Sequence, residues 1–134
     1  MLDRTLRTLR ITHGAMLFSI VLYAVILFVL NPLVKDLPNT FPVIFYFLGV
    51  INVGVALFMR SYMLGTAEEK LQMTPEDPAA LADLRNAYIV SFAFCESAAL
   101  FGFVLRFLGS SWIHAAALFG FSIIGLLLCT PRRP

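Results

Sequence analysis

One carboxylate stands apart from the other charged side chains of this sequence. Glu96 lies about nine residues into a predicted apolar helix over residues 87–108, which places it roughly 14 Å from the start of that helix. A carboxylate at such a depth in a bilayer costs at least about 2.5–3.5 kcal/mol to insert, so a functional role is its default interpretation. Apolar surroundings disfavour the charged form, and we expect the protonated form to dominate unless a partner or an ion compensates the charge. A group that alternates between the two forms suits proton or cation binding.

Other polar side chains are predicted at the same depth. Asn52 and Ser122 lie in two other apolar helices at the level of Glu96, and Ser97 follows Glu96 directly. We therefore predict that Glu96, Asn52, Ser97 and Ser122 form a proton- or ion-binding layer, which Tyr23 lies deep enough to face. Ordinary bonding between helices is the alternative for Asn52 and Ser122. For the carboxylate, the alternative is a protonated Glu96 that only holds a helix pair together.

Small residues share the helix faces that carry these polar groups. Gly49 and Ala56 lie on the face of Asn52 through the spacing i, i+3, i+7, and Ala93 lies on the face of Glu96. Small residues permit close backbone approach between membrane helices. The predicted helix-packing positions are Gly49, Ala56, Ala93 and Gly102.

The composition predicts the elements that must position these side chains. Of the 134 residues, 60% are hydrophobic and only 13% are charged, and the mean hydropathy is +0.86. Soluble domains average about 45–50% apolar and about 25% charged residues, so this composition indicates a membrane protein. A bilayer core of about 30 Å requires roughly 20 mainly apolar residues per helix. The segments that satisfy this requirement are residues 11–30, 41–59, 87–108 and 112–129.

The fold class predicted from these segments is an all-α polytopic membrane protein with four transmembrane helices, in a single domain over residues 1–134. Lipid offers no partners for exposed backbone groups, which favours helices, and residues 21–30 lack the alternation of barrel strands. The first apolar run is too long for a cleavable signal peptide and has no small-residue cleavage site. The connections at 32–40 and 109–111 are short, so we expect helices 1–2 and helices 3–4 to be antiparallel neighbours.

The basic residues predict the orientation of the chain. Only Lys35 and Arg106 fall near one side of the membrane, and Arg106 is expected to reach the surface there. The other basic residues lie in the N-terminal segment, the central loop and the tail: Arg4, Arg7, Arg10, Arg60, Lys70, Arg85, Arg132 and Arg133. Because cytoplasmic segments carry an excess of Lys and Arg, both termini are predicted to be cytoplasmic. The bacterial inner membrane is the expected location.

The central polar segment is predicted to end one helix and to start the next. Gly65 and Thr66 indicate a helix end, whereas Asp77 and Pro78 suit the N-cap and the first position of a new helix. The third helix should therefore begin several residues before its apolar part.

No other residues combine into a recognisable reactive site. His13 and His114 are predicted at opposite ends of the bilayer, so they cannot share one haem iron. Cys95 and Cys129 are predicted at different depths, which supports neither a disulfide nor a zinc site, and both are expected to be small buried side chains. The sequence has no phosphate loop, nucleophile triad or metal motif, and its net charge of +2 is too small for a nucleic-acid binder. We expect no cofactor, no metal and no nucleic-acid partner.

Residues 85–104 resemble the carboxylate-bearing helix of the rotary ATPase proteolipids, the c subunits. The shared core is Ala93-Phe94-x-Glu96 followed by a small residue, then an aromatic–glycine pair at Phe101-Gly102 and a further apolar run. In that family the glutamate binds the transported proton or sodium ion, and the matching residue here is Glu96. The resemblance implies a proteolipid-like hairpin made by the second and third predicted helices, to which the first and fourth are additions.

These observations predict a small integral membrane subunit, proteolipid-like, whose midplane carboxylate binds or relays a proton or a cation. One midplane site cannot carry ions across a membrane alone, so a homo-oligomer or a complex with other membrane subunits is expected within the lipid bilayer. The alternative is a non-catalytic structural or accessory subunit of a larger membrane complex, in which Glu96 bonds to a partner.

Overall fold

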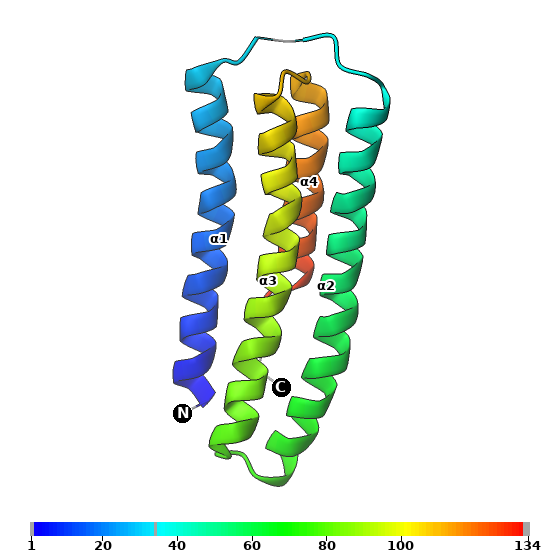
Figure 1. Cartoon of the computed structure of the whole chain (residues 1–134). Coiled ribbons are helices and arrows are strands. Elements are labelled where there is room, and N and C mark those ends of the chain that lie inside the picture. The colour runs from blue at the N-terminus through cyan, green and yellow to red at the C-terminus, as the bar shows by residue number, and fades with distance from the viewer. Residues whose placement is uncertain (1, 34, 133–134) are drawn as a thin grey trace.

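The chain forms four helices in the computed structural model, which describes residues 2–33 and 35–132 (Figure 1). Arg133 of the predicted basic tail lies outside the described residues. The prediction of an all-helical fold is confirmed. The helices are α1 (Leu2–Leu30), α2 (Thr40–Met73), α3 (Pro78–Phe107) and α4 (Trp112–Leu128).

Three of these helices, α1, α2 and α3, are long and apolar enough to cross a membrane. The fourth, α4, has 17 residues and is therefore about 25 Å long. It is apolar along its length but shorter than the hydrocarbon core of a typical bilayer, which is about 30 Å thick.

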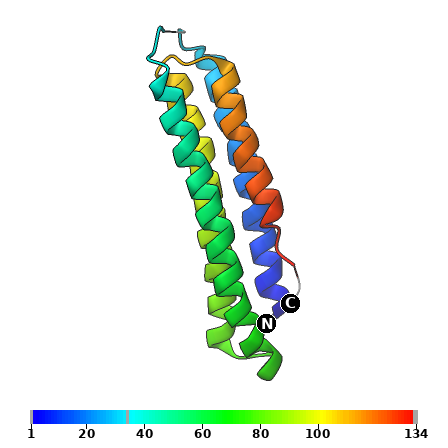
Figure 2. The same ribbon diagram turned by 90° about the vertical axis from the view of Figure 1, so that its right-hand side faces the viewer.

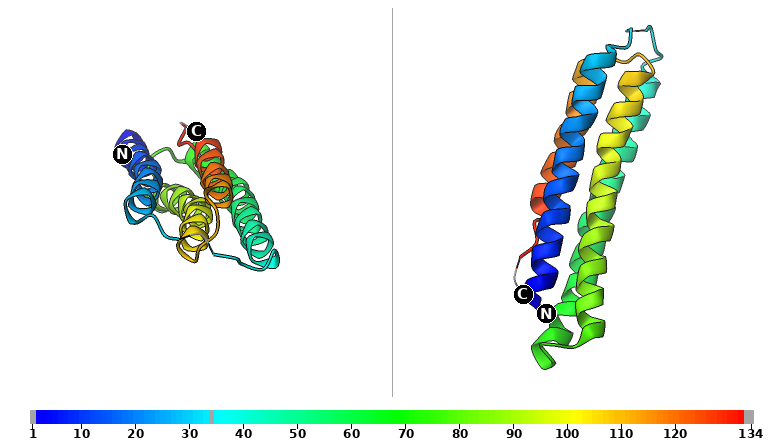
Figure 3. Two further views of the ribbon diagram at one scale, coloured as in Figure 1. Left: turned by 90° about the horizontal axis from the view of Figure 1, so that it is seen from above. Right: turned by 90° about the vertical axis from the view of Figure 1, so that its left-hand side faces the viewer.

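Helix α3 is the centre of the bundle and contacts α1, α2 and α4 (Figures 1 and 3). Within the described residues α1 and α2 do not touch, so the prediction that the first two helices are neighbours is wrong, whereas α3 and α4 do pack together. The chain passes from α1 to α2 over residues 31–39, across the end of the bundle, where Lys35 is hydrogen-bonded to Gly109 of the α3–α4 turn (Figure 1). An extended segment of this length spans roughly 30 Å, which is enough to step over a helix.

The two ends of the bundle differ in what they contain. Both termini and the turn between α2 and α3 lie at one end, here called the termini end (Figures 1 and 2). The connections 31–39 and 108–111 lie at the opposite end, where the amide of Lys35 donates to the carbonyl of Gly109 at 2.8 Å. Gly109 has φ +112°, and a Cβ at this position would lie 2.8 Å from Cβ of Lys35. Only glycine therefore lets the two connections pair so closely.

Helix α2 continues through the predicted helix end at Gly65 and Thr66, so that prediction is wrong. Leu64, Ala67 and Leu71, on either side of this pair, are buried, and α2 packs against α3. Burial of this apolar face outweighs the modest helix-breaking tendency of one glycine, which is about 1 kcal/mol relative to alanine.

Helix α3 begins as the sequence predicts, with Asp77 as its N-cap and Pro78 at its first position. The Asp77 carboxylate accepts a hydrogen bond from the amide of Ala79 at 3.0 Å. Lys70 of α2 forms an ion pair with Asp83 of α3, with Nζ and Oδ2 3.1 Å apart. These contacts fix the α2–α3 turn at the termini end.

Large apolar side chains cover much of the outer surface of the bundle. Phe28 of α1, Phe47 of α2 and Ile113 of α4 are all more than 60% exposed. The buried core, in contrast, contains many small residues, among them Ala56, Ala87, Ala98 and Ala99. An apolar exterior of this extent is typical of a surface that faces lipid or partner helices.

Candidate carboxylate site between α1 and α3

Glu96 of α3 meets two hydroxyl groups of α1. Its Oε1 atom accepts hydrogen bonds from Oγ of Ser19 and from the hydroxyl of Tyr23, the latter at 3.1 Å. Ser19 and Tyr23 are four residues apart and therefore share one face of α1. All three side chains are half-buried. The sequence placed Tyr23 near this layer, but it gave no sign of Ser19.

Aromatic packing holds Tyr23 in position. Its ring lies against that of Phe103 in α3, with centroids 5.7 Å apart, and Phe103 stacks on Phe107 at 6.3 Å. Phe103 is two helical turns beyond Glu96 on nearly the same side of α3. Aromatic rings therefore adjoin the carboxylate site on the side toward the opposite end of the bundle.

Ser19 has a second acceptor within reach of its hydroxyl group. Its Oγ lies 2.7 Å from the carbonyl oxygen of Met16, one turn earlier in α1. A serine carries one hydroxyl proton, so it donates either to Met16 or to Glu96 at a given moment.

The other predicted ligands bond elsewhere. Ser97 donates to the carbonyl of Phe94, and the buried Ser122 of α4 donates at 2.7 Å to the carbonyl of Cys95. Asn52 is half-buried on α2 and makes no hydrogen bond within the described residues. Glu96 lies on the side of α3 that meets α1, which is why the polar groups of α2 and α4 do not reach it.

Three of the four predicted packing residues lie where helices meet. Gly49, Ala56 and Gly102 are buried, and a Cβ at Gly49 or Gly102 would come within 2.8 or 3.0 Å of Leu118 in α4. Ala93 instead lies on the exposed side of α3 and takes no part in packing within one chain.

Glu96 also borders the outer surface of the bundle. Four exposed residues of α3 recur at helical spacing around it, namely Ile89, Ala93, Leu100 and Val104. Glu96 follows Ala93 by three residues and precedes Leu100 by four, so it lies on the same stripe. One side of the carboxylate therefore faces α1, and the other side faces whatever surrounds the chain.

The two histidines are far from one another, in agreement with the sequence prediction. His13 is buried within the bundle rather than at a helix end, because α1 begins at Leu2, and its Nε2–H donates at 2.6 Å to the carbonyl of Leu126. His114 of α4 is hydrogen-bonded to the hydroxyl of Tyr46 in α2.

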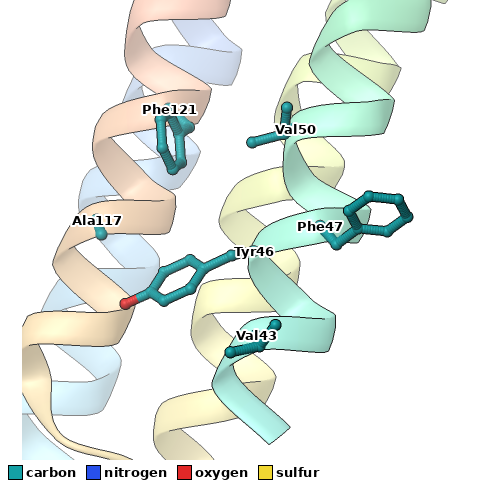
Figure 4. Close-up of a pocket in the computed structure, with 6 residues that line it drawn as sticks. All are labelled: Val43, Tyr46, Phe47, Val50, Ala117 and Phe121. Atoms are coloured by element: carbon teal, nitrogen blue, oxygen red, sulfur yellow. The ribbon is translucent and has the colours of Figure 1, made fainter. Parts of the chain in front are cut away.

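An apolar groove of about 470 Å³ lies between α2 and α4, apart from the carboxylate site (Figure 4). Tyr46 crosses this groove, and its hydroxyl points toward α4 (Figure 4). The lining residues are Val43, Tyr46, Phe47, Val50, Ala117 and Phe121. None of them carries a group that ionises near neutral pH, so the groove suits apolar contact rather than ion binding.

The two cysteines are neighbours, so the prediction that they lie at different depths is wrong. Their Sγ atoms are 4.0 Å apart, and both side chains are fully buried, as expected. The sequence prediction failed because α4 covers only the part of α3 nearer the opposite end of the bundle. Cys129, just past the end of α4, therefore lies beside Cys95.

Arg106 does not reach the surface, contrary to the sequence prediction. Its side chain is 2% exposed, and its guanidinium carbon lies 5.2 Å from the ring centroid of Trp112. The guanidinium group has a favourable contact with the face of this ring, whereas its Nε and Nη1 atoms are buried without a hydrogen-bond partner in the part of the chain that the structure describes.

Within the described part of the chain, no group of three or more His, Cys, Asp or Glu side chains is placed to hold a metal ion. No protein-family model, curated protein or solved structure matches this chain. The carboxylate with its two hydroxyl donors is therefore the site from which a function is argued.

Proposed function

We propose that this chain is a small membrane subunit in which Glu96 binds and releases a proton or a cation within the bilayer. The observation that carries this proposal is the pair of hydroxyl groups, from Ser19 and Tyr23, that donate to Oε1 of Glu96. Such donors stabilise an ionised carboxylate without a basic partner. The resemblance of residues 85–104 to the rotary ATPase proteolipids supports the same function.

The hydrogen bonds of Ser19 suit both protonation states of Glu96. When Glu96 is ionised, Ser19 donates to its Oε1 atom. When Glu96 carries a proton, the hydroxyl of Ser19 can turn to the carbonyl of Met16, 2.7 Å away, and accept from the carboxyl group. Leaving a buried polar group unpaired costs about 1–3 kcal/mol, and this exchange avoids that cost in either state. A proton can thus be gained or lost without repacking the helices.

Because Glu96 lies on the exposed stripe of α3, it can exchange a proton or a cation with a group outside this chain. Within one chain, the stacked rings of Phe103 and Phe107 follow Glu96 along α3 toward the opposite end of the bundle, and neither ring offers a polar group to carry a proton. A second copy or another membrane subunit beside α3 would supply the polar path that a single chain lacks. We therefore propose that the chain works in a homo-oligomer or in a larger membrane complex.

The distribution of basic residues supports an orientation with the termini end in the cytoplasm of a bacterial cell. Arg4, Arg7 and Arg10 precede the apolar part of α1, and Lys70 and Arg85 flank the α2–α3 turn. Basic residues near membrane helices are retained on the cytoplasmic side.

A structural role is the second candidate, and the packing of α1 favours it specifically. Helix α1 touches α3 and α4 but not α2, and its bonds to Glu96 are among its few polar contacts with the rest of the bundle. In this reading Glu96 stays protonated and holds α1 in place, and the chain serves as an accessory subunit of a complex.

Labelling with a hydrophobic carbodiimide as the pH is varied distinguishes the two functions, because a carboxyl group that titrates loses its reactivity as the pH rises, whereas one that stays protonated keeps it. Such reagents reach carboxyl groups inside the bilayer and modify the protonated form. For an ion-binding site, we expect modification of Glu96 near neutral pH. Glu96→Gln should abolish both labelling and proton uptake while leaving the size of the assembly unchanged. Glu76→Gln, which changes an exposed acid of the α2–α3 turn, is the matched control and should alter neither.

The structural function predicts a different set of results. If Glu96→Gln releases α1 or dissociates the complex, and the wild-type protein does not exchange a proton, Glu96 is a packing residue. Partial proteolysis of the variant would reveal a loosened α1.

A further inference from the structure

The buried thiols of Cys95 and Cys129 are in direct contact. Their Sγ atoms are 4.0 Å apart, and neither side chain is exposed. A disulfide needs about 2.05 Å between the sulfurs, so the two side chains must turn toward each other to close the bond. Gly125 makes room for this arrangement, since a Cβ there would lie 2.9 Å from Sγ of Cys95.

The position of Cys129 makes it the more accessible of the two thiols. Cys129 caps the C-terminal end of α4, and its amide bonds back to the carbonyls of Gly125 and Leu126. Helix ends open more readily than helix centres, so Cys129 is exposed transiently at low cost. The thiolate is the nucleophile in thiol–disulfide exchange, so the thiol that a reagent reaches first is the one that reacts first.

We infer that Cys95 and Cys129 form a reversible disulfide by exchange with a small disulfide compound, and that this bond ties the end of α4 to α3 next to Glu96. The thiolate of Cys129 attacks one sulfur of the compound, whose S–S bond breaks and releases one thiol. Cys95 then attacks Sγ of Cys129, the Sγ–Sγ bond forms, and the second thiol leaves. The two cysteine protons end on the two released thiols, and the two cysteines lose two electrons to the compound. The inference does not depend on the proposed function of Glu96.

Treatment of the full-length protein in lipid with an apolar aromatic disulfide, 4,4′-dithiodipyridine, tests this inference. We expect the release of two thiones per chain and a product lighter by two hydrogen atoms. A digest should contain a peptide that joins Cys95 to Cys129. Cys95→Ser and Cys129→Ser should each release one thione and retain a mixed disulfide, and circular dichroism checks that both variants keep their helices.

The rate of closure shows whether the folded structure brings the thiols together. Closure of the disulfide should be at least about tenfold faster in the folded protein than in denaturant, where the intervening chain separates the cysteines. A stable mixed disulfide on the wild-type protein would overturn the inference, and so would equal closure rates in folded and denatured protein.

Discussion

The chemistry of Glu96 depends on two hydroxyl groups that a neighbouring helix supplies. Ser19 and Tyr23 both donate to the same carboxylate oxygen, and Ser19 has the carbonyl of Met16 as a second acceptor. No basic side chain lies within hydrogen-bonding reach of Glu96 in the described residues. In the proposed function these two dipoles stabilise the ionised form, and the proton exchanges because no permanent ion pair holds the carboxylate in one state.

Removal of the Ser19 hydroxyl should favour the protonated form of Glu96. A hydrogen bond to a charged group contributes about 1.5–3 kcal/mol, so we expect Ser19→Ala to speed carbodiimide modification near neutral pH by about tenfold. Ser97→Ala, which removes a hydroxyl bonded to its own helix, is the control and should leave the rate unchanged. Equal rates for the two variants would show that Ser19 does not govern the charge of Glu96.

Sequence reasoning could find Glu96 but not its partners. A lone carboxylate in a long apolar run is visible in the sequence because its insertion cost sets it apart. Ser19 is inconspicuous among the small residues of α1, and its role depends on which helix α1 packs against. Depth and a shared face of small residues predict Asn52 at the site, whereas Asn52 lies on a helix that meets a different side of α3.

At the scale of the helices, close approach of α3 and α4 depends on glycine at position 102. A Cβ there would lie 3.0 Å from Cβ of Leu118 and 3.1 Å from the carbonyl oxygen of Ala115. We expect Gly102→Val to lower the free energy of unfolding by about 1–3 kcal/mol, measured in mixed detergent micelles. Gly54→Val is the matched control, because nothing lies within 4 Å of a Cβ at Gly54. A similar loss for both would assign the effect to helix propensity rather than to packing.

The start of α3 depends on the carboxylate of Asp77, which accepts from the amide of Ala79. Loss of such an N-cap costs about 0.5–2 kcal/mol. Asp77→Ala should therefore speed amide hydrogen exchange in the first turn of α3, and Glu76→Ala should not. Unchanged exchange in Asp77→Ala would mean that Pro78 and packing against α2 define this helix start by themselves.

Hydropathy predicted the apolar segments well, but not how long the helices are or how they pair. Gly65 and Thr66 indicate a helix end in the sequence. In the structure α2 continues past them, because Leu64, Ala67 and Leu71 are buried. The pairing of α1 with α3 depends on tertiary contacts that a short connection does not determine, since residues 31–39 can cross a neighbouring helix. The N-cap at Asp77 could be predicted because it is a local interaction.

The two ends of the molecule differ, because both termini and the α2–α3 turn lie at one end (Figures 1 and 2). In a background in which both cysteines are replaced by serine, a new cysteine at Gln72 lies at the termini end and one at Asp36 lies at the opposite end. An impermeant maleimide added to intact cells should label Asp36→Cys and spare Gln72→Cys, because the basic residues favour a cytoplasmic termini end. Labelling of both positions from outside would contradict the proposed orientation.

The central claim, that Glu96 gains and loses a proton, is tested most directly by infrared difference spectroscopy of the protein in lipid as the pH is changed. We predict a protonated-carboxyl band that disappears on raising the pH, with a matching rise of carboxylate bands, and that is absent in Glu96→Gln but present in Glu76→Gln. A spectrum in which no titrating carboxyl band is lost on replacement of Glu96 would contradict the proposal and favour the structural role.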